Sequence, residues 1–532
     1  MKKLLLIAWL FANVYRMQAQ LIPNCQIIDI NNISASFASD GMIALRMLDT
    51  TQQFEVPKGS GVQALFAGTL WMGGLDAGEN LHLAANRYYQ NGRDFFPGPV
   101  ATVYNAAYDQ KYNRVWKIDA AAIQYHIQHY TDGGYTVPAE IADWPAHGNQ
   151  NNGEAFYLAP FVDVNNNHYY DPANGDYPFI KGDEALYLVY NDLRDLHTES
   201  SGMQLGVEVH QMIYGYTNPT VNSTIFINTR IFNRSANNYH DVVVGSWNDF
   251  DLGCFNDDLV GCDTVMDAFF CYNGVGVDAP CMGANKDTTV MPSIGVTFLN
   301  TALLDFAYFT NGAPASMTDP SNAPGYWNYM NCTWINGMPF THGGTGYNSG
   351  AATCYLFSGN PCDTADWSDL VYSGLPPGDR RAVGNTGKFS LPAGSNICFD
   401  MAYVYAEGDA NSDCLANGVT ALKQSMQDVK QFYQENQLGC FSSYLGITKV
   451  QEVGQLNCFP NPASNTLTID LGNMPSGNFL ISIIDMQGTV VYTQHSTVTA
   501  LLHLEVSPFA KGIYAVHAKG KQGVYTQKVV IE

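Results

Sequence analysis

The sequence predicts an all-β protein: a β-sandwich region of one or two sandwich units with one helix near its C-terminal end, followed by a small immunoglobulin-like β-sandwich. Three observations support this fold class. Short apolar segments alternate with turns rich in Gly, Asn and Pro along most of the chain. Charged residues make up 14% of the sequence and aromatic residues 13%, which is typical of a chain with a large core. One stretch near residue 420 has the apolar spacing of a helix.

The first nineteen residues have the pattern of a signal peptide. Lys2 and Lys3 precede an apolar run over residues 4–12, and Ala19 offers a small residue for cleavage before Gln20. This run is too short to span a bilayer, and no later stretch reaches about eighteen apolar residues. We therefore expect residues 1–19 to be removed during export and no transmembrane segment to be present.

Residues 20–160 form a predicted N-terminal β-rich region. Its candidate strands lie at residues 41–48, 64–72, 81–89 and 115–130, the last interrupted at residues 120–122. His126 and His129 fall in the last of these. Three residues apart on a strand, they would face opposite sides of the sheet, so we interpret them as ordinary polar positions and not as metal ligands.

Residues 161–440 form a predicted β-sandwich region with acidic loops. Oxygen ligands alternate in its first loop, at Asp163, Asn165, Asn167, the Tyr169 carbonyl and Asp171, with Asp176 close by. This spacing resembles an EF-hand-like or dockerin-like loop and predicts a calcium site. His168 stands where such loops place Gly, and Asn174 where they place a bidentate Glu. The alternative is an Asx-rich turn whose side chains bond their own backbone.

Long strands are expected next, over residues 205–216, 223–233 and 240–247. The alternation along residues 225–232 puts apolar side chains on both faces, which predicts sheet packed on sheet. An acidic loop follows the third strand, with carboxylates at Asp249, Asp251, Asp257, Asp258 and Asp263. Carboxylates this close repel one another unless a cation lies between them or they protonate. A second calcium site, a solvated loop and a catalytic carboxylate pair are the three interpretations.

Aromatic side chains crowd the region before the helix, at Tyr326, Trp327, Tyr329, Trp334 and Tyr347. Exposed aromatics of this kind bind sugar rings or partner proteins. We favour the alternative, that they pack under their own loops. The helix itself is predicted from Val419, Leu422, Met426, Val429 and Tyr433, with Asp413 or Asn417 as its cap and Gly439 at its end. It should lie on a sheet face or edge.

Twelve cysteines in an exported chain favour disulfides. Four lie close together in the sequence, at Cys254, Cys262, Cys271 and Cys281. Of their three possible pairings, Cys262–Cys271 nested inside Cys254–Cys281 is favoured. Cys414 and Cys440 should not be joined, because the helix between them spans roughly 34 Å, whereas bonded cysteines have Cα atoms at most about 7 Å apart.

After a linker over residues 441–455, residues 456–532 form a predicted small antiparallel β-sandwich. Its strands are expected at residues 467–471, 479–485, 490–494, 501–506, 512–517 and 525–531. The strings FPNPASNTLTIDL, IDMQGTVV, KGIYAVH and the final KVVIE resemble the type A C-terminal sorting domain of type IX secretion cargo. The resemblance implies a secreted or outer-surface protein of a Gram-negative bacterium, with the type IX secretion machinery as a partner.

A second resemblance lies upstream. The strings FEVPKGSG (residues 54–61), LFAGTLWMGGLDAG (65–78) and DFFPGP (94–99) resemble a family of large uncharacterised exported proteins that end in the same kind of tail. That family implies no activity. The resemblance therefore adds no chemistry.

Two functions from different classes fit the passenger, residues 20–440. The net charge of −23 makes nucleic acid a poor partner, and no Gly-x-Ser-x-Gly, His-Glu-x-x-His, Walker or dinucleotide motif occurs. The favoured hypothesis is a non-catalytic, calcium-stabilised module that binds glycan or protein. The alternative is a secreted hydrolase of polysaccharide or peptide that uses carboxylates among Glu208, Asp249, Asp251 and Asp258. His210, or His240 with Asp241, could join such a site.

Overall fold

The computed structural model describes residues 21–48, 51, 53–274, 290–312, 314–409, 411–440, 447–448, 452–471, 478–485, 490–497, 501–520 and 523–532. The predicted signal peptide lies outside them, as does much of the predicted linker. The chain divides into two compact units: residues up to 161 with 167–446, and residues 162–166 with 447–532. Strands dominate both units, which confirms the predicted all-β class.

The first unit is built on a large antiparallel sheet of nine strands in its described part. Their order is β14 (Asp258–Asp263), β15 (Ala268–Asn273), β16 (Val290–Phe298), β20 (Asn396–Asp409), β12 (Thr224–Asn233), β11 (Val207–Gly215), β10 (Glu184–Asn191) and β6 (Phe96–Pro97), with β7 (Trp116–Asp119) also paired to β10. Two of the long predicted strands, residues 205–216 and 223–233, are β11 and β12 of this sheet.

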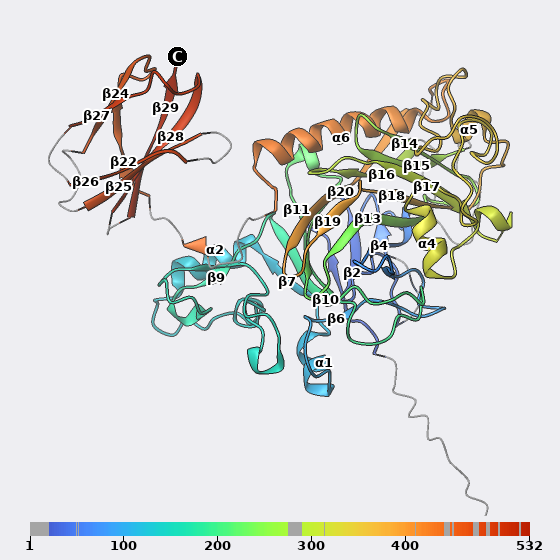
Figure 1. The fold of residues 1–532 in the computed structure, drawn as a ribbon, viewed down its shortest axis with the longest axis horizontal. Coiled ribbons are helices and arrows are strands. Elements are labelled where there is room, and N and C mark those ends of the chain that lie inside the picture. Colours follow the sequence, from blue (N-terminus) through green and yellow to red (C-terminus); the bar gives the residue numbers. More distant parts are fainter. Residues whose placement is uncertain are drawn as a thin grey trace, which may run out of the picture. The chain divides into compact units, whose positions relative to one another are not determined.

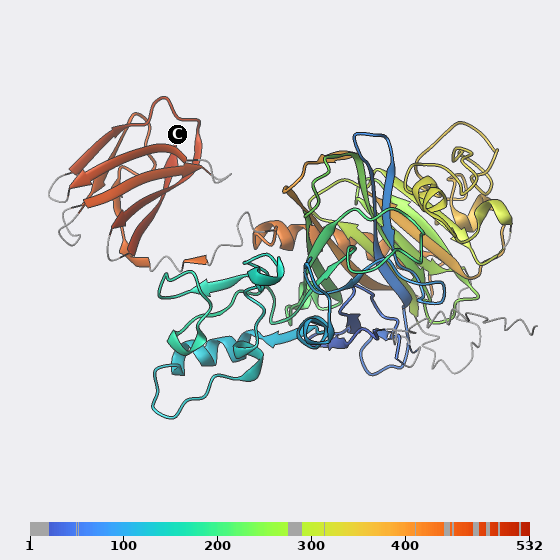
Figure 2. The same cartoon turned by 60° about the horizontal axis from the view of Figure 1, so that its bottom comes forward.

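A second sheet, of six strands, faces the first. Its order is β17 (Asp305–Thr310), β18 (Arg380–Asn385), β13 (Tyr239–Phe250), β4 (Leu65–Leu75) and β5 (Leu81–Ala85), with β19 (Phe389–Leu391) also paired to β13. A small sheet of β1 (Cys25–Ile28), β2 (Ser34–Ala38) and β3 (Phe54–Glu55) joins the same core. The long loops between β17 and β18, drawn in yellow, gather at one end of the sandwich (Figure 2).

The two large sheets pack face to face around one apolar core. Along β12, Ile225 and Ile227 belong to this core, whereas Phe226, which points the other way, belongs to a second core on the outer face. Tyr403 of β20 donates its hydroxyl to Asn248 of β13 across the sandwich at 2.6 Å. Both faces of the nine-stranded sheet are thus covered, as the alternation along residues 225–232 predicts.

The long helix α6 (Asn417–Glu435) lies on the outer face of the nine-stranded sheet, along β20 and β16 (Figure 1). The five apolar side chains that predicted it are its buried stripe. Its cap differs from the prediction. Neither Asp413 nor Asn417 caps the helix, because the N-cap position is Ala416, which is buried in the outer core and makes no side-chain capping bond.

Shorter helices and isolated strands complete the first unit. The helices are α1 (Ala106–Tyr112), α2 (Ala120–His129), α3 (Ala139–Ala142), α4 (Ala323–Tyr329) and α5 (Asp369–Tyr372). Single 3₁₀ turns lie at Gln150–Asn152, Pro172–Asn174, Pro219–Val221 and Ala315–Met317. The short strands β8 (Phe161–Asp163) and β9 (Tyr177–Pro178) flank the predicted calcium loop.

Two predicted strands of the N-terminal region are wrong. Residues 115–130 are not one strand: β7 ends at Asp119 and α2 begins at Ala120, because three consecutive alanines have high helix propensity. His126 and His129 therefore lie on a helix. Residues 41–48 form turns and no strand, with two isolated bridges from Ile43, to Phe37 and to Gly68. The left-handed backbone of Ala44 (φ 67°) interrupts any extended run there.

Three disulfides join described residues of the first unit: Cys332–Cys354, Cys362–Cys414 and Cys398–Cys440. They confirm that Cys414 and Cys440 are not joined to each other. The predicted Cys262–Cys271 bond is wrong, since both are free and buried. In the β14–β15 hairpin these two cysteines are diagonal neighbours, a spacing of about 7–8 Å that exceeds the reach of a disulfide. Cys254 is disulfide-bonded, and Cys281 lies outside the described residues.

The second unit is a small sandwich with its own core. One sheet has the order β22 (Glu452–Gln455), β29 (Gly523–Ile531), β28 (Gly512–Gly520), β25 (Asn478–Asp485) and β26 (Val490–Thr497). The other has β23 (Asn457–Phe459), β24 (Thr466–Asp470) and β27 (Leu501–Glu505), and the two-residue strand β21 (Ile447–Thr448) precedes both. Leu467, Ile469, Ile481 and Val516 lie in its core, as the alternation predicts.

Candidate functional site

A buried glutamate–histidine pair lies on the outer face of β11. Glu208 Oε1 accepts from His210 Nε2 at 2.9 Å and from Arg234 Nη2 at 2.6 Å, and its Oε2 accepts the Val100 N–H at 2.8 Å. With Nε2 donating to Glu208, the Nδ1 of neutral His210 is an acceptor, and the Tyr187 hydroxyl lies 3.3 Å from it. The pair thus has the donor order of a general-base dyad.

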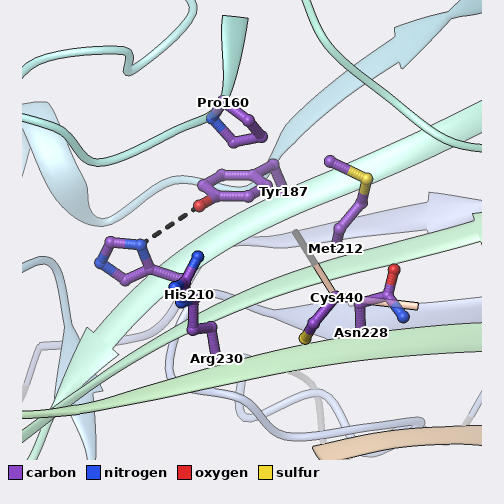
Figure 3. Close-up of a pocket in the computed structure, with 7 residues that line it drawn as sticks. All are labelled: Pro160, Tyr187, His210, Met212, Asn228, Arg230 and Cys440. Carbon is purple, nitrogen blue, oxygen red and sulfur yellow. Dashed lines mark hydrogen bonds between the residues drawn. The ribbon is translucent and has the colours of Figure 1, made fainter. Parts of the chain in front are cut away.

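The space beside this pair is small. Tyr187, His210, Met212, Asn228 and Arg230 line it, together with Pro160 and Cys440 (Figure 3). Its volume is about 20 Å³, which is the room of one water molecule. The Tyr187 hydroxyl is itself held by the Leu158 carbonyl at 2.7 Å. A sugar or peptide substrate does not fit beside His210.

Burial and neighbouring charges fix the protonation state of the Glu208–His210 pair at neutral pH. Burial alone raises the pKa of Glu208, but the hydrogen bond and charge of His210 and the charge of Arg234 bring it down to about 2. Burial lowers the pKa of His210. At neutral pH the pair is therefore a carboxylate held by a neutral imidazole and a guanidinium, which is a stable structural arrangement.

The acidic loop after β13 is divided among different partners. Asp249 is buried, accepts the Tyr88 hydroxyl at 2.7 Å and pairs with Arg381 at 3.3 Å. Asp263 forms an ion pair with Lys423 at 2.8 Å. The structure therefore does not gather all five predicted carboxylates into one cluster.

Three of the aspartates do remain close to one another. Asp258 is fully buried, and its pKa is raised well above the usual range by burial first and then by the nearby charges of Asp251 and Asp257. Burial likewise raises the pKa of Asp249, with a further contribution from Asp251. Glu208 lies on β11, five strands along the nine-stranded sheet from β14, which begins with Asp258. The four carboxylates of the hydrolase hypothesis thus fall into two separate groups.

The predicted calcium loop contains hydrogen bonds between its own polar groups. Asn167 accepts the Tyr169 N–H at 2.7 Å, and Asp171 Oδ2 accepts from Asn167 and Asn174 at 3.0 and 2.9 Å. Asp176, which is fully buried, accepts the Asp171 N–H at 3.0 Å. Asp163 is buried at the end of β8, and Asn165 and Tyr169 are exposed. Within the described ranges no group of three His, Cys, Asp or Glu side chains is arranged to hold a metal ion. The calcium site stays a prediction.

His168 and Asn166 of this loop have left-handed backbones, with φ of 67° and 61°. This conformation favours glycine, which is the residue that calcium loops of this kind place at the position of His168. The backbone at position 168 therefore has a conformation that glycine would adopt more readily than histidine.

The crowded aromatics pack inwards. Tyr326, Tyr329 and Trp334 are fully buried in the main core, and Trp327 and Tyr347 are partly buried against it. Tyr326 also donates to Glu199, which pairs with Arg87 at 2.7 Å. The preference for packing over ligand binding is confirmed for this group.

An open basin that the sequence analysis did not anticipate lies beside α1, with a volume of about 510 Å³. Its walls come from residues 93–109 and from the loop after β10 that contains Arg194. Arg194 forms a two-pronged ion pair with Asp109, one prong at 2.9 Å. Phe96 supports the Arg93 guanidinium, whose central carbon lies 5.0 Å from the ring centre. The sequence gives little indication of this basin, because the two segments that form its walls lie about a hundred residues apart in the chain.

The second unit is the part that comparison identifies. A family model described as the secretion system C-terminal sorting domain matches residues 457–532, which span both sheets of the unit. These residues are a type IX C-terminal sorting domain. The resemblance of the tail is thereby confirmed, and the protein is type IX cargo exported to the cell surface or beyond it. The sorting-domain match does not extend upstream, so the resemblance of residues 54–99 stays a prediction.

Other comparisons add no function to that of the sorting domain. A search of curated proteins found no match. Among solved structures, a polysaccharide lyase is 8% identical with a TM-score of 0.20, over 70% of this chain and 39% of the lyase. An amine oxidase of Aspergillus nidulans is 9% identical with a TM-score of 0.27, over 73% and 53%. The dimeric latent PorU of Porphyromonas gingivalis is 10% identical with a TM-score of 0.14, over 86% and 42%. The chain spans about half or less of these structures.

Among the residues that the structure describes, no helix is both long enough and apolar enough to cross a bilayer.

Proposed function

We propose that the first unit is a non-catalytic, calcium-stabilised module that binds glycan outside the cell, where the sorting domain delivers it. The observation that carries this proposal is the open basin of about 510 Å³ beside α1. Concave sites of this volume, with aromatic walls and a few polar groups, are where proteins bind small ligands. A protein partner with a flat surface would not enter this basin, whereas an oligosaccharide could. We therefore favour a glycan ligand over a protein ligand.

The small size of the space beside His210, compared with the open basin, favours a binding function over a catalytic one. The dyad there has room for one water molecule only, and its glutamate is held by three donors. A glycosidase needs two carboxyl groups about 5 Å or 6.5–9.5 Å apart across a substrate cleft. Glu208 instead lies five strands away from Asp258 along the nine-stranded sheet, a separation of about 24 Å at the usual strand spacing, so these two carboxyl groups do not flank one bond.

Filling the basin should abolish ligand binding. Ala106 lines it and is exposed, so Ala106→Trp places a large ring inside without removing a charge. Ala107→Trp, also exposed and on the same helix but not lining the basin, is the matched control. On a glycan array with exported protein, the first variant should lose all signals and the second should keep them. Equal signals from both variants would place the ligand elsewhere, and release of shortened sugars would favour the hydrolase.

Calcium should stabilise the protein through the loop that begins at Asp163. A ligand that binds only the folded form adds RT ln(1 + [L]/Kd), so a site of about 10⁻⁴ M contributes about 1.4 kcal/mol at millimolar calcium. Asp163→Ala should remove most of that increment. His168→Gly should enlarge stability in either buffer, because φ of 67° costs a non-glycine residue about 1 kcal/mol. Thermal melts with calcium and with chelator measure both, and identical wild-type midpoints would show that the loop is an Asx turn.

A further inference from the structure

One nitrogen of the Arg93 guanidinium, Nη1, lacks an acceptor. The side chain lines the basin and Arg93 is only 5% exposed. Its backbone is fixed by Thr198, whose hydroxyl accepts the Arg93 N–H at 3.0 Å and whose own N–H donates to the Arg93 carbonyl at 3.2 Å. The buried Nη1 makes no hydrogen bond to any described residue. A buried, unsatisfied donor on a charged group is strongly unfavourable, so Nη1 needs an acceptor from a ligand or from water.

The acid behind Arg93 does not neutralise it as a close ion pair. Asp40 is buried, and its Oδ1 accepts from the Tyr89 hydroxyl at 3.0 Å and from the Met42 N–H at 3.4 Å. Burial raises the pKa of Asp40, and the attraction of Arg93 only partly opposes it. Asp40 therefore acts on Arg93 as a charge at a distance and not as a close ion-pair partner.

The second arginine of the basin is already engaged. Arg194 holds Asp109 with two nitrogens, and its Nε lies 3.4 Å from Asp195. Two carboxylates thus oppose the charge of Arg194. Arg93 is the arginine of the basin that forms no ion pair with a described carboxylate.

We propose that Arg93 binds the anionic group, carboxylate or sulfate, of an acidic glycan seated in the basin. The inference rests on the proposed glycan binding and specifies its ligand class. A planar guanidinium can grip a carboxylate through two parallel hydrogen bonds. Phe96 fixes the plane of the guanidinium from one side, and half-buried Tyr104 on the basin wall offers an aromatic ring for a sugar.

The test measures equilibrium binding of three fluorescent oligosaccharides of equal length to the exported protein: oligogalacturonate, sulfated oligogalactose and neutral oligogalactose. Arg93→Gln should weaken binding of the anionic probe about 10- to 100-fold, since charge-assisted hydrogen bonds of this kind are lost. Binding of the neutral probe should not change. The ratio between the first two probes tells carboxylate from sulfate. Arg114→Gln removes a half-exposed arginine outside the basin and should alter none of them.

Two further measurements separate a ligand role from a structural one. Arg93→Gln should leave the melting midpoint equal or higher, because it removes a buried charge that lacks a hydrogen bond. Asp40→Asn should strengthen binding of the anionic probe, because it removes the competing acid. Equal affinities for anionic and neutral probes in the wild type would overturn the role of Arg93 and leave glycan binding intact. Loss of stability in Arg93→Gln with unchanged affinities would also overturn it. Absence of binding by every probe would overturn both proposals.

Discussion

Truncation after Gly454 is expected to leave the protein in the periplasm, with none in the culture medium or on the outer surface. The truncation removes the whole sorting domain over residues 457–532, which is the part that the type IX machinery recognises. Processing of the N-terminal signal peptide needs only the front of the chain, so the trapped protein should already be shortened at that end. Immunoblots of periplasm, cell surface and medium measure the distribution.

A pair of point substitutions tests whether the folded sorting domain is the signal. Ile483 of β25 is fully buried in its core, so Ile483→Asp should unfold the domain and block export like the truncation. Ile513 of β28 is 37% exposed, so Ile513→Asp should leave export intact. Normal amounts of the truncated chain in the medium would contradict the assignment of the tail.

Glu208→Ala is expected to destabilise the first unit by about 3–5 kcal/mol, the typical result of removing one partner of a buried ion pair. Glu208 is fully buried and satisfies His210, Arg234 and the Val100 N–H together. Asp132→Ala breaks an exposed pair with His129 and should cost less than about 1 kcal/mol. Urea unfolding at neutral pH measures both, and equal midpoints for the two variants would mean that the network adds nothing to stability.

The same network predicts acid sensitivity. The pKa of Glu208 falls from its ordinary 4.5 to about 2 on folding, so the folded state binds its proton less readily. The stabilisation is therefore complete above about pH 4.5 and is lost as the pH falls towards 2. Wild type should lose more stability than Glu208→Gln between pH 5 and pH 3. A parallel decline in the two proteins would contradict the depressed pKa.

The strands and the long helix could be predicted because the spacing of apolar residues in the sequence matches the faces that are buried in the structure. Residues 225–232 alternate, and both of their faces are buried; Val419 to Tyr433 repeat at helical spacing, and that stripe meets the sheet. Prediction failed where the spacing of apolar residues does not match the element that forms. Residues 120–129 lack clear helical spacing, and only the alanines at their start indicate α2.

The basin could not be predicted for a different reason. Arg93 and Arg194 are brought together by pairing of strands. The sequence around either arginine gives no sign that the other lies nearby. The opposite error affected the acidic loop. Asp249 and Asp263 lie in one acidic stretch of the sequence, but in the structure each forms an ion pair with a distant segment, Asp249 with Arg381 and Asp263 with Lys423. Local clustering of like residues predicts a site only when no distant partner reaches them first.

The Cys398–Cys440 disulfide has a mechanical consequence for a cargo whose sorting domain follows the first unit in the chain. Tension that reached Cys440 would pass by this bond into β20, instead of peeling α6 from its C-terminal end one turn at a time. β20 is hydrogen-bonded on both sides, to β12 and to β16, so the load would have to shear two rows of hydrogen bonds together. We therefore expect the first unit to resist tension applied at Cys440 better than it would without this disulfide.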